Sequence, residues 1–204
     1  MRKNYSKIFY RLMPKKTGLY FGTFNPIHIG HCVIAQHMLE FTDLEEIWFV
    51  VTPHNPHKKK NTLLDDYQRL HMVQLAIDDE VNMKVSNMEF GLPQPSYTAK
   101  SLAHATEKWP DREFCLIMGA DNLQTFHKWQ NYEWMLENHH IYVYPRINMD
   151  GGKLKDHPNV TLTDAPIIQM ASTDIRKAIK AGKNVSFMLA PRVWECLLTG
   201  NFYR

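Results

Sequence analysis

The chain has 204 residues and a formal net charge of +3, from 24 basic and 21 acidic side chains. This length suits one domain with a full hydrophobic core, and so small a charge disfavours nucleic-acid binding, which usually needs a basic face. Three separated cysteines without a C-x-x-C pair, no run of 18 apolar residues and no apolar signal-peptide core together predict a cytoplasmic protein with reduced thiols and no membrane span.

The first predicted elements form a strand–helix–strand unit. We expect residues 1–15 to be an N-terminal extension and residues 16–204 to be one domain. Residues 18–21 are apolar and predict a buried strand, which ends in a turn rich in glycine and proline. Apolar residues then recur with helical spacing over 33–39, and residues 47–51 predict a second buried strand. This order is typical of a βαβ unit with a right-handed crossover.

Strands and helices continue to alternate along the rest of the chain. Further strands are expected at 83–85, 114–118, 141–144 and 160–162, with a loop at 53–62. Helices are expected at 64–77, 97–107, 172–181 and 191–198, the third capped by Ser172 or Thr173 and stopped by Gly182. The alternation predicts a single doubly wound, Rossmann-like α/β domain, with a mostly parallel sheet covered by helices on both faces.

Two loops are the expected ligand sites, because such sheets bind ligands beyond the carboxyl ends of the strands where the strand order reverses. The loop after the first strand reads Gly22-Thr23-Phe24-Asn25-Pro26-Ile27-His28-Ile29-Gly30-His31, and the loop after the fourth reads Gly119-Ala120-Asp121-Asn122. In the first loop, two histidines three residues apart can both face a helix N-terminus, where free N–H groups favour phosphate. The loop matches neither G-x-G-x-x-G nor a P-loop.

The first loop resembles the G-[TS]-F-[DN]-P-x-H-x-G-H signature of the nucleotidyltransferase superfamily with the T/H-x-G-H motif. Residues 171–176, Ala-Ser-Thr-Asp-Ile-Arg, resemble its late I-S-S-T-x-I-R motif. Within the superfamily, the chain is similar to the bacterial nicotinate mononucleotide adenylyltransferases over nearly its whole length. Residues 53–58 resemble their P-x-x-P-H-K loop, residues 95–98 their P-S-Y-T segment, and residues 119–129 their G-x-D-x-L…W segment.

The resemblance implies in-line attack by the acceptor's 5′-phosphate on the α-phosphorus of ATP, giving deamido-NAD and pyrophosphate. Mg²⁺ would arrive with ATP and would need no protein metal site. The residues that would carry the catalytic step are His28, His31, Lys58 and Arg176. Those expected to bind ATP in addition are Gly22, Thr23, Phe24, Gly119, Asp121, Ser172, Thr173 and Ile175. Those expected to bind nicotinate mononucleotide are Asn25, Tyr97, Thr98, Asp121 and Trp129.

Some observations leave alternatives open. Ala171 replaces the first serine of I-S-S-T, and Lys100 stands where the family commonly has an acid, near the expected acceptor site. The acceptor could instead be nicotinamide mononucleotide or phosphopantetheine, or the chain could be a nucleotide sensor without catalysis. Taken alone, Trp129 is more often a packing residue than a stacking platform, and the lysines at 58–60 a solvated loop. A homo-oligomer is compatible with the sequence.

Overall fold

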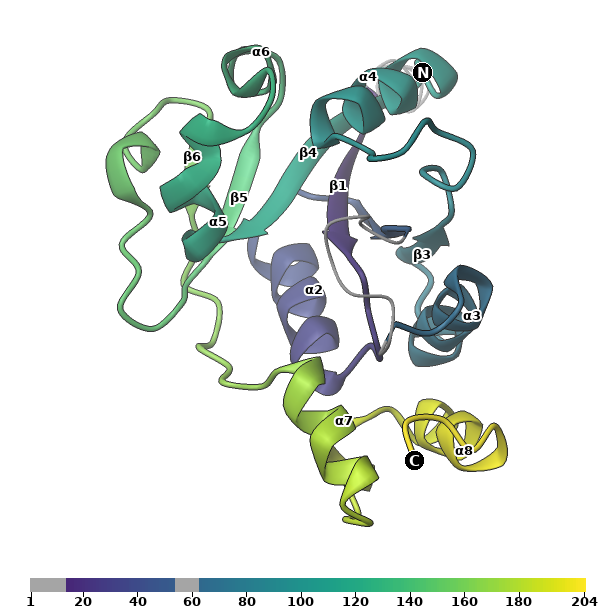
Figure 1. Ribbon diagram of the computed structural model, residues 1–204. Coiled ribbons are helices and arrows are strands. Elements are labelled where there is room, and N and C mark those ends of the chain that lie inside the picture. Colours follow the sequence, from purple (N-terminus) through teal and green to yellow (C-terminus); the bar gives the residue numbers. More distant parts are fainter. Residues whose placement is uncertain (1–13, 54–62) are drawn as a thin grey trace, which may run out of the picture.

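A six-stranded parallel sheet forms the centre of the computed structural model, which describes residues 14–53 and 63–204. The strand order is β3-β2-β1-β4-β5-β6, so the order reverses between the neighbouring strands β1 and β4 (Figure 1). The predicted fold class is therefore confirmed. Residues 1–13 of the predicted N-terminal extension, and Lys58, lie outside the described part, whereas Lys15 at the end of that extension already belongs to β1.

All six predicted strands are present, and their ends extend the predicted ranges by at most three residues. Each neighbouring pair is parallel; for example, Leu19 pairs with Trp48 on one side and Leu116 on the other. The strands are β1 (Lys15–Gly22), β2 (Glu46–Val51), β3 (Met83–Ser86), β4 (Arg112–Gly119), β5 (Ile141–Tyr144) and β6 (Val160–Leu162).

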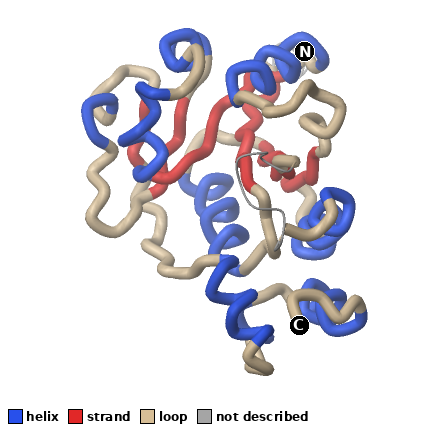
Figure 2. Tube along the Cα trace, in the orientation of Figure 1, coloured by secondary structure: helices blue, strands red, loops and turns tan. Residues whose placement is uncertain are grey.

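Helices cover both faces of the sheet and create two hydrophobic cores (Figures 1 and 2). Along each central strand, successive side chains enter opposite cores, as the alternation of a strand requires. One face is covered by α2 (Ile29–Phe41), α3 (Asp66–Ile77), α7 (Ser172–Lys180) and α8 (Pro191–Thr199). The other is covered by α4 (Thr98–Lys108), α5 (Ala120–Thr125) and α6 (Tyr132–Asn138), with the short 3₁₀ turn η2 (Phe126–Lys128) after α5.

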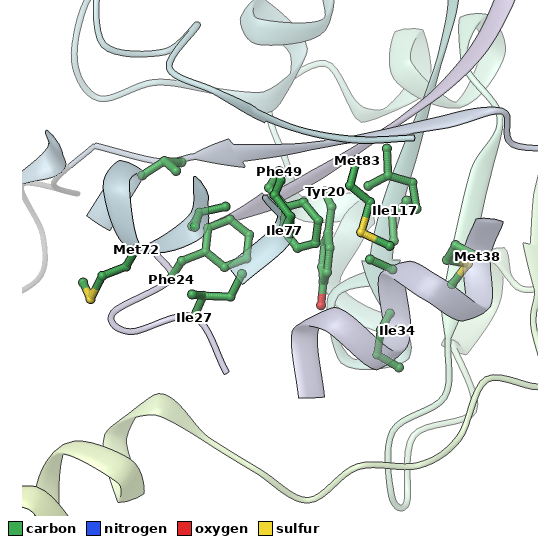
Figure 3. Packing of buried hydrophobic residues seen from close by; sticks show 14 of the residues in the cluster. Tyr20, Phe24, Ile27, Ile34, Met38, Phe49, Met72, Ile77, Met83 and Ile117 are labelled. Atoms are coloured by element: carbon green, nitrogen blue, oxygen red, sulfur yellow. The ribbon is translucent and has the colours of Figure 1, made fainter. Parts of the chain in front are cut away.

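The core under α2 reaches the first site loop. Phe24 and Ile27 of that loop are fully or almost fully buried, and they join the same cluster as Phe49 and Ile77 (Figure 3). Burial of these two side chains therefore anchors the loop to the sheet just before His28 and His31.

The prediction missed α5 and α6, since no helix was expected between residues 119 and 141. These helices have six and seven residues, too few for the window of 11 to 18 in which helical periodicity can be recognised. Two further short 3₁₀ turns, η3 (Gly152–Leu154) and η4 (Ser186–Met188), lie in connecting segments. Among the described helices, none has both the length and the apolar character needed to cross a bilayer.

The predicted cap of α7 was wrong. The N-cap is Ala171, whose side chain cannot accept a hydrogen bond, and Ser172 is the first helical residue. The Ser172 hydroxyl donates instead to the main-chain oxygen of Pro26, at 2.8 Å. The predicted stop is confirmed: Gly182 has a φ of +69° and its N–H donates to Ile179, a left-handed C-terminal cap.

Candidate active site

Two histidines stack on each other at the N-terminus of α2. His28 is the N-cap and His31 is the third helical residue; their ring centroids are 3.7 Å apart and their planes differ by 26°. Burial, together with a smaller contribution from the nearby Arg146 guanidinium, lowers the pKa of His28 to about 4. Burial also holds the pKa of His31 well below its usual value, with smaller contributions from His28 and Arg146. Both rings are therefore neutral at pH 7.

The tautomer of His31 follows from one hydrogen bond. The main-chain N–H of His28 donates to Nδ1 of His31 at 3.2 Å. In a neutral imidazole, a nitrogen that accepts leaves the proton on the other nitrogen, so Nε2 of His31 carries the hydrogen. His31 thus presents an uncharged donor beside the helix N-terminus, where the helix dipole also favours an anion.

Glycine 30 makes room for this arrangement. A Cβ added to Gly30 would lie 3.0 Å from Nδ1 of His28 and 3.1 Å from a side-chain carbon of Ile168. Either neighbour would have to move, and a shift of His28 would disturb the stacked pair. The glycine of the H-x-G-H pattern is therefore needed for the side chain of the first histidine, in addition to the tight entry into the helix that the sequence predicts.

Helix α7 fastens the loop that carries the histidines. Besides the bond from Ser172 to Pro26, Arg176 donates from Nη1 to the main-chain oxygen of Asn25 at 2.7 Å and from Nη2 to the Thr173 hydroxyl at 3.4 Å. Ser172 and Arg176 thus brace the early motif across 146 and 151 residues of sequence. Part of the Arg176 fork remains available, because a guanidinium has five N–H donors.

Asn25 lies inside the protein. Only 4% of its surface is exposed, and its side-chain oxygen accepts from the Leu64 N–H and the Tyr203 hydroxyl. Nearby, the fully buried Arg69 donates to the main-chain oxygens of Thr23 and Thr52. Asn25 thus fixes the loop through these hydrogen bonds, and its predicted contact with the acceptor stays a prediction.

Arg146 completes the basic side of the site, and the sequence prediction did not include it. It is the second residue after β5, and its guanidinium lies 5.0 Å from the Tyr144 ring centroid and 3.6 Å from a carboxylate oxygen of Asp121. Gly119 permits this approach, since an added Cβ would be 2.3 Å from Asp121 and 3.2 Å from Arg146. A signal was present: Arg146 comes just after a buried strand, at the edge where ligands bind.

A cleft of about 500 Å³ opens between these charged residues and the segment before α7. Arg146 lies at its border with a second hollow that is lined by His28, His31, Tyr20 and Tyr144. The walls of the larger cleft are mostly apolar. Asp121, which the sequence predicts to contact a nucleotide, also lines this cleft. The lining residues are Asp121, Arg146, Ile147, Met149, Ile167, Ile168, Gln169, Met170, Ala171 and Asp174.

Three of the residues expected to contact ATP have little or no exposed side chain for that contact. The side chains of Phe24 and Ile175 are 2% and 1% exposed and pack in the core, so only their main chains can reach a ligand. At Gly22, an added Cβ would meet the Phe24 ring at 2.8 Å. Gly22 therefore accommodates the folded-back Phe24, whose φ of +44° is unusual for a bulky residue.

The residues expected at the acceptor lie on the α4–α5 side of the sheet. Tyr97 is the N-cap of α4 and makes no side-chain cap hydrogen bond, and Thr98 is the first helical residue. Trp129 follows η2 half-buried, with its ring 5.2 Å from that of Phe126. Its packing against this core agrees with the structural role that a lone tryptophan usually has. Its remaining exposed surface is what stacking would use.

The geometry agrees with a comparison against family models. Residues 19–178, which include His28, His31 and the start of α7, match the cytidylyltransferase-like family. The chain belongs to the cytidylyltransferase-like family. Among curated relatives in this group, one from Flavobacterium johnsoniae is 60% identical over 93% of this chain and 99% of its own length. One from Bacteroides fragilis is 44% identical over 90% and 91%. Both are named "Probable nicotinate-nucleotide adenylyltransferase".

Solved structures support the same fold for this cytidylyltransferase-like chain. The nicotinic acid mononucleotide adenylyltransferase of Plasmodium falciparum, complexed with APC, superimposes with a TM-score of 0.78. It covers 93% of this chain and 97% of its own, at 19% identity. A structure of the same Plasmodium enzyme complexed with NaAD gives the same values.

Proposed function

We propose that the chain is a nicotinate-nucleotide adenylyltransferase, which transfers AMP from ATP to nicotinate mononucleotide and releases pyrophosphate in NAD biosynthesis. The observation that carries the proposal is the stacked, neutral histidine pair at the N-terminus of α2, next to Arg146 and braced by α7. Relatives that the chain matches over almost their whole length carry the same name.

The α-phosphate of ATP is best placed at the N-terminus of α2. There Nε2–H of His31 donates a hydrogen bond to the charge that builds on the phosphoryl oxygens in the transition state. Arg146 and Arg176 supply fixed positive charge, which neutralises the negative charge of the departing pyrophosphate. A transfer of this kind needs positioning and electrostatic stabilisation and no covalent intermediate with the protein. Lys58 is proposed to join these cations; it lies outside the described residues.

The adenosine end of ATP fits the cleft of about 500 Å³ beside Arg146. Its apolar walls, formed by residues such as Ile147, Met149 and Ile167, suit a flat base. Asp121 is proposed to accept hydrogen bonds from the ribose hydroxyls, since its carboxylate lines this cleft. The Thr173 hydroxyl, at the start of α7, adds a phosphate contact.

Magnesium is proposed to enter as MgATP. Among the described residues, no group of three His, Cys, Asp or Glu side chains could hold a metal ion. Proteins usually bind Mg²⁺ through substrate phosphates and at most one or two carboxylates, so the ion can arrive on the ATP phosphates without a protein metal site.

The acceptor is proposed to lie between α4 and η2. Because Tyr97 does not cap α4 with its side chain, the first N–H groups of this helix and the Thr98 hydroxyl can receive the nicotinate carboxylate. The exposed part of Trp129 would stack on the pyridine ring. A carboxylate is the better partner for a helix N-terminus, so this end of the site favours nicotinate over nicotinamide.

Product analysis tests the proposal. Pure protein is incubated with MgATP and, in separate reactions, with nicotinate mononucleotide, nicotinamide mononucleotide or phosphopantetheine. Deamido-NAD and pyrophosphate should form fastest with the first acceptor. Turnover only with another acceptor would leave the adenylyl transfer intact and disprove the acceptor assignment. No pyrophosphate from any of the three would instead support a nucleotide sensor without catalysis.

A further inference from the structure

A buried glutamate lies behind the proposed acceptor site and has no part in the roles described above. Glu89 follows β3 and is only 2% exposed. Its Oε1 accepts a hydrogen bond of 2.5 Å from the hydroxyl of Ser101, which is itself fully buried in the first turns of α4. Burying a carboxyl costs free energy of folding, and one hydrogen bond offsets only part of that cost. The position of Glu89 therefore needs an explanation beyond stability.

The contacts of Glu89 link two segments of the chain. Its main-chain oxygen accepts from the side chain of Gln94 at 3.3 Å, and that side chain accepts in turn from the N–H of Ser96 at 3.2 Å. Burial raises the pKa of the Glu89 carboxyl, and the Ser101 hydroxyl, with smaller contributions from Thr52 and Ser96, partly offsets that rise. Glu89 therefore connects the turn after β3 with the start of α4.

The start of α4 is where these contacts converge. Ser96 and Ser101 flank Tyr97 and Thr98, and the main-chain oxygen of Tyr97 accepts from the N–H of Ser101 at 3.1 Å. The carboxyl thus holds this first turn of α4 through Ser101, and the main chain of Glu89 holds the segment before it through Gln94. The second carboxyl oxygen of Glu89, Oε2, is buried without a hydrogen-bond partner among the described residues. Stability alone would be served better by an apolar residue of similar size.

We propose that Glu89 is a positioning residue for the acceptor nucleotide, which holds the first turn of α4 in the orientation that binds the nicotinate carboxylate. The inference rests on the proposed function for the identity of the acceptor. Glu89 is too deeply buried to touch the acceptor, so it acts through Ser101. The property that matters is the ability of its carboxyl to accept a hydrogen bond from the Ser101 hydroxyl.

Steady-state kinetics with each substrate varied tests this role. Glu89→Ala should raise KM for nicotinate mononucleotide about tenfold, the effect of losing one buried hydrogen bond to the carboxyl, and should change KM for ATP less than twofold. Glu89→Gln keeps an oxygen for Ser101 and should restore KM to within about threefold of wild type. Ser101→Ala should raise the same KM, since it removes the donor and keeps the carboxyl.

Glu46→Ala is the matched control, because Glu46 is an equally buried glutamate at the opposite edge of the sheet. It should lower the melting temperature and leave both KM values unchanged. Equal changes of both KM values in Glu89→Ala, or an unchanged acceptor KM in Ser101→Ala, would overturn the proposal. So would a Glu89→Gln variant as impaired as Glu89→Ala. If Glu89→Ala does not fold, the acceptor KM values of Ser101→Ala and Glu89→Gln still test the positioning role.

Hydrogen exchange separates this proposal from the proposed function. The amides of residues 96–101 should exchange faster in Glu89→Ala and Ser101→Ala than in wild type, and no faster in Glu89→Gln or Glu46→Ala. If wild type adenylylates no acceptor, the proposed function fails, while local exchange at 96–101 still shows whether Glu89 holds the turn. Unchanged exchange at residues 96–101 in both Glu89→Ala and Ser101→Ala would refute the positioning role.

Discussion

The sheet has an amino edge, where its parallel strands begin, and a carboxyl edge, where they end. Buried charges are paired differently at these two edges. At the amino edge, the Glu46 carboxylate is 2% exposed and contacts three cations, Lys15, Lys84 and Arg112, together with the indole N–H of Trp48. At the carboxyl edge, the buried His28 and the partly buried His31 are kept neutral, and Arg146 and Arg176 lie around them. The only acidic partner that the described residues give Arg146 there is Asp121, at 3.6 Å.

This difference separates a structural cluster from a ligand site. At the amino edge, opposite charges neutralise one another and hold the pKa of Glu46 down at about 2, despite its burial. At the carboxyl edge, the positive charges and the histidine donors exceed what nearby acids satisfy, so an anionic ligand supplies the missing partner. Perturbed pKa values occur at both edges, and the pairing of the charges is what distinguishes them.

The largest expected effect is on catalysis at the carboxyl edge. His31→Ala should reduce turnover by roughly two to three orders of magnitude, the usual loss when one preorganised donor to a transition state is removed. Steady-state rates with saturating MgATP and nicotinate mononucleotide measure it, with circular dichroism to verify the fold. Near wild-type turnover would show that the phosphate site has been misplaced.

His139→Ala is the control for that variant. His139 is also a buried histidine with a pKa lowered by burial, but it lies before β5 and contacts the main-chain oxygen of Phe114 at 2.8 Å. Its loss should reduce stability and leave turnover unchanged at temperatures where the protein is folded.

The second effect is on stability at the amino edge. Glu46→Ala leaves Arg112, Lys15 and Lys84 without their shared carboxylate, and should lower the free energy of unfolding by roughly 2–3 kcal/mol. Urea denaturation measures this, while kcat/KM for both substrates should stay within twofold of wild type. A large loss of activity in the folded variant would show that the two edges are not independent.

A smaller effect is expected at the acceptor. Trp129→Ala should raise KM for nicotinate mononucleotide roughly tenfold, because stacking of a base on an aromatic ring contributes about 1–3 kcal/mol. KM for ATP should change little. Trp134, which is 38% exposed on α6, provides the control, and Trp134→Ala should affect neither KM. Equal effects of the two variants would mean that Trp129 only packs against Phe126.

The smallest effect is a difference in pH dependence between the edges. Since His28 has a pKa of about 4 when folded and near 6.5 when unfolded, the unfolded chain binds more protons between these values. Stability should therefore fall as pH drops from 6.5 towards 4, by at most about 1.4 kcal/mol per pH unit from this ring. His28→Asn should remove that part of the slope.

Glu46 should act in a lower pH window. Its pKa is depressed from 4.5 to about 2, so its contribution is complete above 4.5 and is lost as pH falls towards 2. Urea denaturation at several pH values should show Glu46→Ala flattening the slope only below about 4.5. If both variants changed the same pH range, the assignment of the two windows would be wrong.

Much of the fold could be predicted from local patterns. Buried strands such as residues 47–51 are continuous apolar runs, and their alternation with helices fixes a parallel sheet and the position of its ligand edge. The histidines at 28 and 31 were predicted for the same reason, since their spacing and the helix start lie within ten residues of sequence. Helices α5 and α6 could not be predicted, because they are too short for a periodic signal.

The sequence by itself thus determined the strands, the long helices and the motif at the start of α2. Only the tertiary structure decided that Arg146 joins the histidines, that Asn25 is buried under Tyr203, and that Glu89 contacts Ser101. The physical reason is distance along the chain: an element depends on neighbours a few residues away, whereas the partners of a buried polar group come from segments that only the packed sheet brings together.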